Sequence, residues 1–360
     1  MKKIGILTFH NAINYGAVLQ CFALQETIKK VNNDVTIINY QSKNIKNSNK
    51  LLHFDNLKLF IKDFVFLPYN IVKKRKFDTF LNENLNLSNK IKHDSFDENV
   101  NQNYDIVIVG SDQVWNSKLV DKEEDVYFFK NIKVEKNSYS ASVGNLTTKN
   151  LENIKEMTKD FKNVSVREED LKEALVEKYN LVVEHTLDPT LLLTKNDWEC
   201  SMVKDKNKVK DNYVLIYLLQ QNSLFESIAN YLIDNNFVKK AYTFSKKKLG
   251  IANISNKITA GPIEFVNMFY NSSYVVTNSF HGLAFSIIFE KQFFVLLPNE
   301  REGRLVSLLK KLKLENRIIK QIEDIPKVSK DIIDYNYVKS MLEKERINSI
   351  NYIKKILENE

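Results

Sequence analysis

The sequence predicts an α/β fold made of two Rossmann-like domains that face each other across a cleft. Apolar runs of strand length alternate with helical patterns along most of the 360 residues. The alternation stops at a polar, Lys-rich stretch, 204–212, and then restarts, which indicates a linker between two halves. Unbroken apolar runs such as Ile106–Val109 are typical of parallel strands covered on both faces. A chain of this length suits two domains better than one.

The first half of the chain alternates from its start. The expected strands are 3–8, 34–40, 105–109, 137–142, 164–167 and 181–185. The expected helices are 15–30, 57–85 with a break at Pro68, 148–161 and 168–179. Residues 15–30 carry apolar side chains at helical spacing, whereas the strand segments are short apolar runs. We expect these elements to form an N-terminal domain, residues 1–200, on the acceptor side of the cleft.

The second half repeats the alternation. The expected strands are 213–219, 238–244, 274–277, 293–297 and 316–319. The expected helices are 223–235, one after Pro262, one that opens at Gly282, and 304–313. We therefore expect a C-terminal domain over residues 210–330. Residues 335–357 show an apolar stripe of helical period, so the segment 335–360 should be a final helix, which could pack back on the first domain.

Composition excludes several classes of protein. The net charge is +8, and the basic residues are spread through Lys- and Asn-rich surface segments, so we favour anionic substrates over nucleic acid. Cys21 and Cys200 lie too far apart in sequence to suggest a disulfide framework or a metal site, which points to a reducing compartment. The apolar run at the N-terminus is too short for a signal peptide, and no window approaches 18 apolar residues. We expect a cytoplasmic protein.

The segment 272–289 is the most informative in the chain. It reads as a buried strand, a short polar turn and an apolar helix, and His281 lies in the turn. Ligands of open α/β sheets bind at such strand ends, and helix N-termini favour anions. An imidazole there can move a proton beside a bound anion. Asn278, Ser279 and Gly282 have small side chains or none, which leaves room for a ligand. The alternative is a histidine held by local hydrogen bonds.

A second candidate segment, 110–116, follows the apolar strand 105–109. Gly110 permits close backbone approach, Ser111 offers a hydroxyl, and Asp112 offers a carboxylate. Trp115 could stack on the face of a sugar ring. The alternative is an ordinary turn with Trp115 in the core.

Three further positions at strand ends or helix starts could bind a substrate. His10 follows the first strand, and Tyr15 and Gly16 open the first helix. The alternative for this helix start is a cap by Asn14 without any ligand. No phosphate-binding glycine motif is present, so this signal is weak.

Arg167 and Asp188 follow two later strands. Arg167 could hold a carboxylate or phosphate through two hydrogen bonds, or it could pair with Glu168 or Glu169. Asp188 could be a catalytic carboxylate or the cap of a turn.

Taken together, six segments resemble the polysaccharide pyruvyl transferase family. They are Asn14–Gln20, Gly110–Asn116, Ser165–Glu168, Leu187–Thr190, Thr277–Gly282 and Gly303–Leu309, which run in the family's order. The resemblance implies a two-domain fold similar to GT-B glycosyltransferases. It implies transfer of pyruvate from phosphoenolpyruvate to a sugar as a ketal, with release of phosphate.

The resemblance also implies roles for single residues. His281 matches the family histidine that contacts phosphoenolpyruvate and acts as general acid, and Arg167 matches an arginine that binds the donor. Many members carry an arginine where this chain has Ser279, so Arg301 or Arg304 could supply that charge. The base for the sugar hydroxyls could be Asp112, Asp188 or His10.

The implied partners are a donor and an acceptor. The donor is phosphoenolpyruvate, a co-substrate, and no cofactor or metal is implied. The acceptor is a glycan or lipid-linked saccharide of exopolysaccharide biosynthesis in the cell envelope. Contact with the inner face of the membrane would suit such an acceptor. Two alternatives stay open: a GT-B-type glycosyltransferase that uses a nucleotide sugar, and a non-catalytic carbohydrate-binding homologue.

Overall fold

The computed structural model describes residues 2–31, 34–52, 54, 57–144, 146–203, 212–247, 249–297 and 302–358. The chain divides into two compact units. Unit 1 consists of Met1–Pro68, Phe77–Leu192 and Lys344–Glu360, and unit 2 consists of Tyr69–Lys76 and Leu193–Glu343. These bounds differ from the expected 1–200, 210–330 and 335–360, because helices that are continuous in sequence contribute to both units. The expected linker, 204–212, lies outside the described residues except for Asn212.

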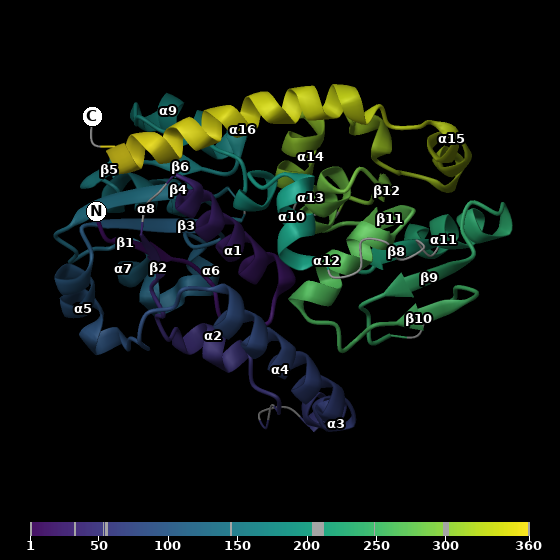
Figure 1. Ribbon diagram of the computed structural model, residues 1–360, viewed down its shortest axis with the longest axis horizontal. Coiled ribbons are helices and arrows are strands. Elements are labelled where there is room, and N and C mark those ends of the chain that lie inside the picture. The colour runs from purple at the N-terminus through teal and green to yellow at the C-terminus, as the bar shows by residue number, and fades with distance from the viewer. Residues whose placement is uncertain are drawn as a thin grey trace. The chain divides into compact units, whose positions relative to one another are not determined.

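Unit 1 is built on a parallel sheet (Figure 1). Its described strands are β1 (Ile4–Leu7), β2 (Val35–Ile37), β3 (Ile106–Asp112), β4 (Glu135–Ala141), β5 (Phe161–Asn163), β6 (Ser165–Val166) and β7 (Glu184–His185). Their order is β2-β1-β3-β4-β6-β7, and β5 pairs with β4. The strand order reverses direction between β1 and β3, so the carboxyl ends of these two strands form the switch point at which open α/β sheets bind ligands.

Helices alternate with these strands along the chain. The described helices are α1 (Tyr15–Lys30), α2 (Lys43–Ser48), α3 (Leu57–Val65), α4 (Leu67–Asn84), α5 (Phe96–Asn103), α6 (Ser117–Val120), α7 (Glu124–Tyr127), α8 (Thr148–Met157) and α9 (Glu169–Tyr179). Helix α1 is buried almost throughout, which agrees with its small residues and its apolar positions. Pro68 lies in the first turn of α4, where its missing N–H costs no helical hydrogen bond. The expected break at Pro68 is therefore the start of a second helix.

Unit 2 is built on a second parallel sheet with the order β10-β9-β8-β11-β12. Its strands are β8 (Tyr213–Tyr217), β9 (Lys240–Thr243), β10 (Ile254–Asn256), β11 (Tyr274–Thr277) and β12 (Gln292–Val295). Its helices are α10 (Lys195–Met202), α11 (Leu224–Asp234), α12 (Pro262–Asn271), α13 (Phe280–Ile288), α14 (Glu302–Lys311) and α15 (Ile325–Lys330). The order is that of a Rossmann sheet, and its switch point lies between β8 and β11.

Two expectations about elements are wrong. The expected strand 316–319 is a 3-10 turn, Glu315–Arg317, followed by a single bridge between Ile318 and Val295. Strands β5 and β10 were not expected, because each is three residues long and lacks an apolar run. Such short strands depend on pairing with a neighbour, which local sequence does not reveal.

The last helix, α16 (Tyr335–Glu358), contributes to both units. In unit 1 the Tyr352 hydroxyl donates to the Ser138 carbonyl at 2.9 Å, and the Leu187 N–H donates to Ser349 Oγ at 3.0 Å. Ile353 and Ile356 are buried there. The end of the chain therefore completes the hydrophobic and polar packing of a unit that begins with the first strand.

Candidate functional site

The switch point of each sheet carries residues that the sequence predicted for a site. We call the carboxyl ends of β1 and β3, with Thr8 and Gly110–Asp112, the first edge. We call the carboxyl ends of β8 and β11, with residues 217–220 and 277–281, the second edge. Each edge is described within its own unit.

Asn278 ties the two strands of the second edge together. Its Oδ1 accepts from the Leu219 N–H at 2.8 Å, and its Nδ2 donates to the Gln220 carbonyl at 2.7 Å. The side chain is buried. Its amide therefore serves the backbone that follows β8, and the expectation that Asn278 leaves room for a ligand is wrong. We assign it a positioning role.

Ser279 caps helix α13. Its Oγ accepts from the Gly282 N–H at 3.4 Å, and its own N–H donates to Thr277 Oγ1 at 3.0 Å. The helix begins at Phe280, two residues before the expected start at Gly282. His281 is therefore the second residue of the helix and not part of the preceding turn. Ser279 is buried, so the structure gives it a cap's role in place of the expected substrate contact.

Gly282 allows the helix to approach the sheet closely. A Cβ atom at this position would lie 2.1 Å from Thr277 Oγ1 and 3.1 Å from Tyr217 Cδ1. Thr277 Oγ1 in turn donates to the Tyr217 carbonyl at 2.7 Å. The space that a side chain at Gly282 would need is thus filled by β11 and β8. The glycine therefore serves the packing of helix on sheet, and the expected substrate contact at Gly282 stays a prediction.

His281 differs from its neighbours in exposure. Of residues 275–289, all of which the structure describes, it alone is not buried. The Phe280 ring meets its imidazole edge to face, with ring centroids 5.4 Å apart. The first turn of α13 carries the positive end of the helix dipole, which favours a nearby anion. His281 is therefore a half-buried residue of the second edge, and the Nε2 atom of its ring is buried.

Helix α14 packs against α13 and brings a cation into this part of unit 2. Arg304 lies in the first turn of α14, and its side chain is half-buried. Arg301, the other arginine proposed to replace the charge missing at Ser279, lies outside the described residues.

At the first edge, His10 is part of the folded core. Its Nδ1 lies 3.2 Å from the Thr8 carbonyl, and its Nε2 lies 3.1 Å from Asn39 Oδ1. Burial lowers the pKa of His10, although the hydrogen bonds to Asn39 and Thr8 oppose that shift. A fully buried ring between two oxygens has no route to a sugar hydroxyl, so the expectation of a base at His10 is wrong.

The start of α1 is likewise a structural feature. Asn14 Oδ1 accepts from the Ala17 N–H at 3.3 Å, as the capping alternative required. Tyr15 is buried with its ring 5.3 Å from that of Phe77, and Gly16 is buried in the helix. Neither Tyr15 nor Gly16 presents a surface for a substrate.

Gly110 and Ser111 join neighbouring strands. Gly110 has φ +115°, and a Cβ there would lie 2.2 Å from the Tyr139 carbonyl oxygen, so only glycine fits. Ser111 is buried; its Oγ donates to the Ser140 carbonyl at 2.8 Å, and its own carbonyl accepts from Thr8 Oγ1 at 2.8 Å. These contacts fix the ends of β1, β3 and β4 and leave both residues without a surface for the expected substrate contact.

Trp115 lies in the core of unit 1. Its ring stacks on Phe128 with centroids 5.2 Å apart, and its Nε1 donates to the Tyr127 carbonyl at 3.2 Å. A buried indole offers no face to a sugar. The expected sugar platform is wrong, and the alternative of a core residue describes Trp115.

Arg167 lies within an ionic cluster that also contains Asp112, Glu168 and Asp188. Its guanidinium is 2.9 Å from Asp188, 3.7 Å from Glu168 and 3.8 Å from Asp112. Burial would lower the pKa of Arg167, but the carboxylates of Glu168, Asp188 and Asp112 outweigh it, and the pKa is raised. The arginine is therefore charged and lies beside three acidic neighbours inside unit 1, which argues against direct binding of an anionic donor.

The three carboxylates of the ionic cluster differ in access. Asp188 Oδ1 accepts from the N–H and hydroxyl of Thr190, and its other oxygen accepts from Arg167, so it caps a turn inside the protein. Glu168 accepts from the Ser142 hydroxyl and is also buried. Asp112, at φ +74°, keeps 14% of its side chain exposed. Among these three acids, Asp112 alone reaches solvent.

Sequence reasoning did not foresee several polar residues that contact the first edge or the ionic cluster around Arg167. Glu168 was considered only as an ion-pair partner, and Ser142 was not considered at all. Gln20 lies inside α1 and donates to Thr8 Oγ1 at 2.8 Å, which links the helix to the end of β1. The sequence signal that could have revealed this contact is a glutamine within a largely apolar helix. A buried glutamine side chain needs a polar partner, which predicts a hydrogen bond to a neighbouring element.

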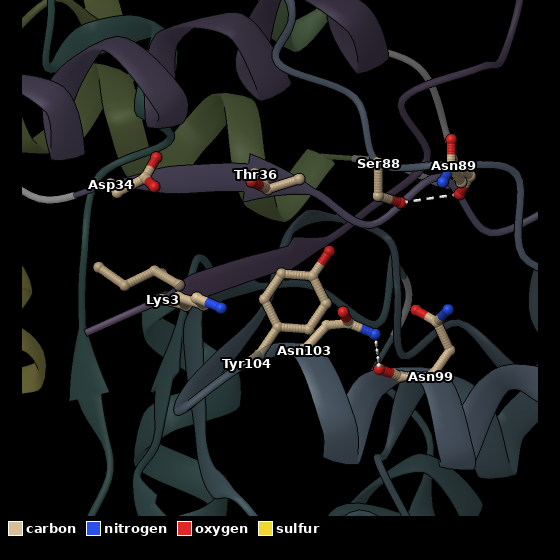
Figure 2. Close-up of a pocket in the computed structure, with 9 residues that line it drawn as sticks. Lys3, Asp34, Thr36, Ser88, Asn89, Asn99, Asn103 and Tyr104 are labelled. Carbon is tan, nitrogen blue, oxygen red and sulfur yellow. Dashed lines mark hydrogen bonds between the residues drawn. The ribbon is translucent and has the colours of Figure 1, made fainter. Parts of the chain in front are cut away.

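The structure also contains a polar pocket in unit 1. Its volume is about 310 Å³ (Figure 2). It is lined by Lys3, Ile4, Asp34, Thr36, Ser88, Asn89, Asn99, Asn103 and Tyr104. Lys3, Asp34 and Tyr104 lie at the amino ends of β1, β2 and β3, whereas Ser88 lies beside Ile37 at the carboxyl end of β2. The lining contains none of the predicted site residues that the structure describes.

Comparison with known proteins places this geometry in context. A family model described as Polysaccharide pyruvyl transferase matches residues 14–301. No curated protein matches the chain. Among solved structures, the chain is similar to UDP-GlcNAc 2-epimerase from Neisseria meningitidis bound to UDP-GlcNAc, with 12% identity, 100% of both chains covered and a TM-score of 0.55.

Two further solved structures show the same fold. S. aureus MnaA, in a co-structure with UDP, is 12% identical over 99% of this chain and 97% of its own, with a TM-score of 0.56. Arabidopsis thaliana UGT89C1, complexed with UDP-L-rhamnose, is 10% identical over 99% and 98%, with a TM-score of 0.50. The expectation of a GT-B-like α/β fold is confirmed for the two parallel-sheet units.

Proposed function

Because the chain belongs to the polysaccharide pyruvyl transferase family, we propose that it transfers pyruvate from phosphoenolpyruvate to a sugar of a cell-surface polysaccharide or its precursor. The product is a pyruvate ketal on two hydroxyls of the sugar, and phosphate is released. The acceptor is a glycan or a lipid-linked saccharide, met at the inner face of the membrane. The reaction uses phosphoenolpyruvate as co-substrate and no further cofactor.

The observation that carries this proposal is the position of His281. An otherwise buried strand-to-helix segment holds one half-buried histidine at the positive end of a helix. An anion such as a phosphate or carboxylate is favoured at that end, and Arg304 on the neighbouring helix adds positive charge to unit 2. A protonated imidazole beside such an anion can act as a general acid.

The chemistry follows from the donor. Protonated His281 gives its proton to the methylene carbon of phosphoenolpyruvate, which makes the adjacent carbon electrophilic. One sugar hydroxyl attacks that carbon and loses its proton to a base. The second hydroxyl then attacks the same carbon as the C–O bond to phosphate breaks, which closes the ketal and releases inorganic phosphate. The proton of the second hydroxyl passes to the neutral imidazole, which restores protonated His281. The base gives its proton to the departing phosphate, which leaves as hydrogen phosphate, so both hydroxyl protons are accounted for.

Asp112 is the best supported base of the three considered. It keeps part of its carboxylate exposed, whereas Asp188 and His10 are buried and engaged by neighbouring groups. Arg167 would then act through Asp112 by holding its carboxylate in place. This replaces the expected role of Arg167 in donor binding with a positioning role.

Two assays test the proposal together. Thermal-shift measurements should show that phosphoenolpyruvate raises the Tm of the protein, because a ligand that binds the folded state stabilises it. Phosphate release should then require both phosphoenolpyruvate and an acceptor glycan. Pyruvate on the glycan, detected by mass spectrometry, would identify the product.

The structurally similar proteins with UDP ligands favour one competing function, a glycosyltransferase that uses a nucleotide sugar. Under that alternative UDP or a UDP-sugar, and not phosphoenolpyruvate, would raise the Tm. Stabilisation by an acceptor glycan alone, without phosphate release, would instead indicate a carbohydrate-binding homologue. Either result would overturn the proposed pyruvyl transfer.

A further inference from the structure

One short stretch carries nearly all of the net charge. Residues 43–76 contain nine basic and two acidic side chains, a net charge of +7, against +8 for the whole chain. The remaining 326 residues are thus close to neutral. The other 44 basic residues are spread over the rest of the chain, where 43 acidic residues balance nearly all of them. Residues 43–68, the part of this stretch that belongs to unit 1, contain five basic and two acidic side chains, a net charge of +3. A basic segment of this kind attracts anions.

Helix α3 lies within this stretch and turns its apolar residues outward. None of residues 58–65, all of which the structure describes, is buried. Ile61, Phe64 and Val65 are 55%, 63% and 61% exposed, and Phe54, just before the helix, is 77% exposed. A helix on the surface of a globular protein normally turns its apolar face to the core. Helix α3 therefore exposes the face that should be covered.

The exposed apolar side chains form one continuous strip. The rings of Phe54 and Phe60 have centroids 5.4 Å apart, and those of Phe60 and Phe64 are 6.3 Å apart. In a helix, Phe60, Ile61, Phe64 and Val65 share one face because they are spaced one, three and four residues apart. We call these five residues the α3 strip. A contiguous exposed patch of this kind marks an interaction site.

Two lysines border the α3 strip on the polar side of the helix. Lys58 and Lys62 are exposed, four residues apart on the flank of α3. Helix α2, which precedes α3 in unit 1, exposes Lys43 and Lys46, and Lys50 follows it. An amphipathic helix with aromatic residues on one face and lysines on the other is suited to the interface of an anionic membrane.

We propose that the α3 strip and its bordering lysines dock the protein on an anionic lipid bilayer, with α3 lying in the headgroup region. The lysines would meet lipid phosphates while the phenylalanine rings enter the boundary with the acyl chains. A second copy of the chain suits this surface less well, because two segments of charge +3 would be brought together. Nucleic acid would satisfy the lysines but leaves four exposed apolar side chains and a partly exposed ring unexplained.

This surface does not rest on the proposed pyruvyl transfer, because it contains none of the site residues. Docking through this surface would bring the enzyme to a lipid-linked acceptor in the membrane. Among the described residues no helix is long and apolar enough to cross a membrane. The docking proposed here is accordingly contact with one face of the bilayer.

Vesicle sedimentation with the full chain tests the proposal. The protein should sediment with vesicles of phosphatidylglycerol and phosphatidylcholine, and it should stay in solution with phosphatidylcholine alone. High salt should weaken the binding, because it screens the lysines. Phe64→Ser should weaken binding about tenfold, because one buried phenylalanine side chain contributes about that much to partition. The double variant Lys58→Glu, Lys62→Glu should weaken it at least as strongly.

Matched variants elsewhere on unit 1 serve as controls. Val182 is 87% exposed and Lys133 is exposed, so Val182→Ser and Lys133→Glu make similar changes outside the surface and should bind vesicles like the unchanged protein. The Tm of Phe64→Ser should be unchanged, because the side chain is already exposed. Phosphate release with a water-soluble acceptor should also be unchanged, which separates this proposal from the proposed function.

Three results would overturn the docking proposal. The unchanged protein could remain in solution with anionic vesicles at low salt. Phe64→Ser could bind vesicles as well as Val182→Ser does. The binding would then depend on the lysines alone, without insertion of the phenylalanine rings. Sedimentation equilibrium could show a dimer that Phe64→Ser converts to a monomer, which would assign the α3 strip to a second copy of the chain.

Discussion

At the scale of single residues, His281 and Arg167 illustrate two fates of a polar group at a strand end. Both follow strands of parallel sheets and both were candidates for contact with an anionic donor. His281 is partly exposed, whereas Arg167 is buried beside three carboxylates. A side chain whose charge is already balanced by its neighbours has little left for a ligand. The two residues should therefore respond differently to substitution.

Replacement of His281 by alanine should lower kcat by about 10²–10⁴-fold, the usual contribution of a general acid. The Tm should hardly change, because the imidazole is only half-buried. Steady-state phosphate release measures the first effect and thermal unfolding the second. His93→Ala, which removes an exposed imidazole from unit 1, is the control and should keep full activity. Full turnover in His281→Ala would remove the acid from the proposed mechanism.

Replacement of Arg167 by alanine should mainly reduce stability. It would leave Asp188 and Glu168 buried without their cation, at a cost of about 3–5 kcal/mol in the free energy of unfolding. Urea denaturation measures this loss. Arg167→Lys should recover only part of it, because an ammonium cannot reach several carboxylates in the geometry of a guanidinium. Unchanged stability together with a raised KM for phosphoenolpyruvate would return Arg167 to donor binding.

At the scale of elements, the junction of β11 and α13 sets the position of His281. Ser279 caps the helix, Asn278 ties the junction to the end of β8, and Gly282 lets the helix contact Thr277. None of these side chains needs to touch a substrate to affect the reaction. A small displacement of the helix start would move the imidazole, and catalysis depends steeply on such positions.

Gly282→Ala should therefore lower both stability and kcat. The added methyl would overlap Thr277, and overpacking of this kind costs about 1–3 kcal/mol in the free energy of unfolding. Gly303→Ala makes the same change at an exposed position in α14, where alanine is favoured over glycine by about 0.5–1 kcal/mol. Thermal unfolding of the two variants should move in opposite directions. Equal effects would show that Gly282 is not held against the sheet.

At the scale of the whole molecule, each unit is assembled from segments that are distant in sequence. Unit 1 takes its last helix from the end of the chain, and unit 2 takes residues 69–76 from within α4. Lys76 pairs with Glu264, and Lys246 donates to Asn70 at 2.6 Å, which holds that segment in unit 2. A chain arranged in this way can complete unit 1 only after residues 344–358 have been added.

Removal of residues 344–360 should accordingly destabilise unit 1 while the strands of unit 2 keep their packing. Limited proteolysis should then cleave within residues 77–192 first. The single change Tyr352→Phe should cost about 1 kcal/mol, because it removes the buried hydrogen bond to the Ser138 carbonyl. Tyr337→Phe, at an exposed position of α16, is the matched control. Protection of unit 1 in the shortened chain would contradict the packing described here.

The sequence by itself determined the elements whose pattern is local and regular. The observed bounds of α1 and β11 are those expected, because a helical or strand period within a short window reports which residues are apolar on one face. The parallel α/β class and the placement of candidate residues at strand ends followed from the same alternation. Strands β5 and β10 could not be predicted, because a segment of three polar or mixed residues is too short to show the alternation of a strand.

Only the tertiary structure decided which side chains reach solvent. Trp115 and His10 entered the core, Asn278 and Gly282 became part of the second edge's packing, and Arg167 met Asp188 from a segment 21 residues away. The spacing of apolar residues in α3 would be the same if this face packed against a core or if it were exposed to solvent. Exposure depends on partners brought together from distant parts of the chain, and a local pattern contains no information about those partners.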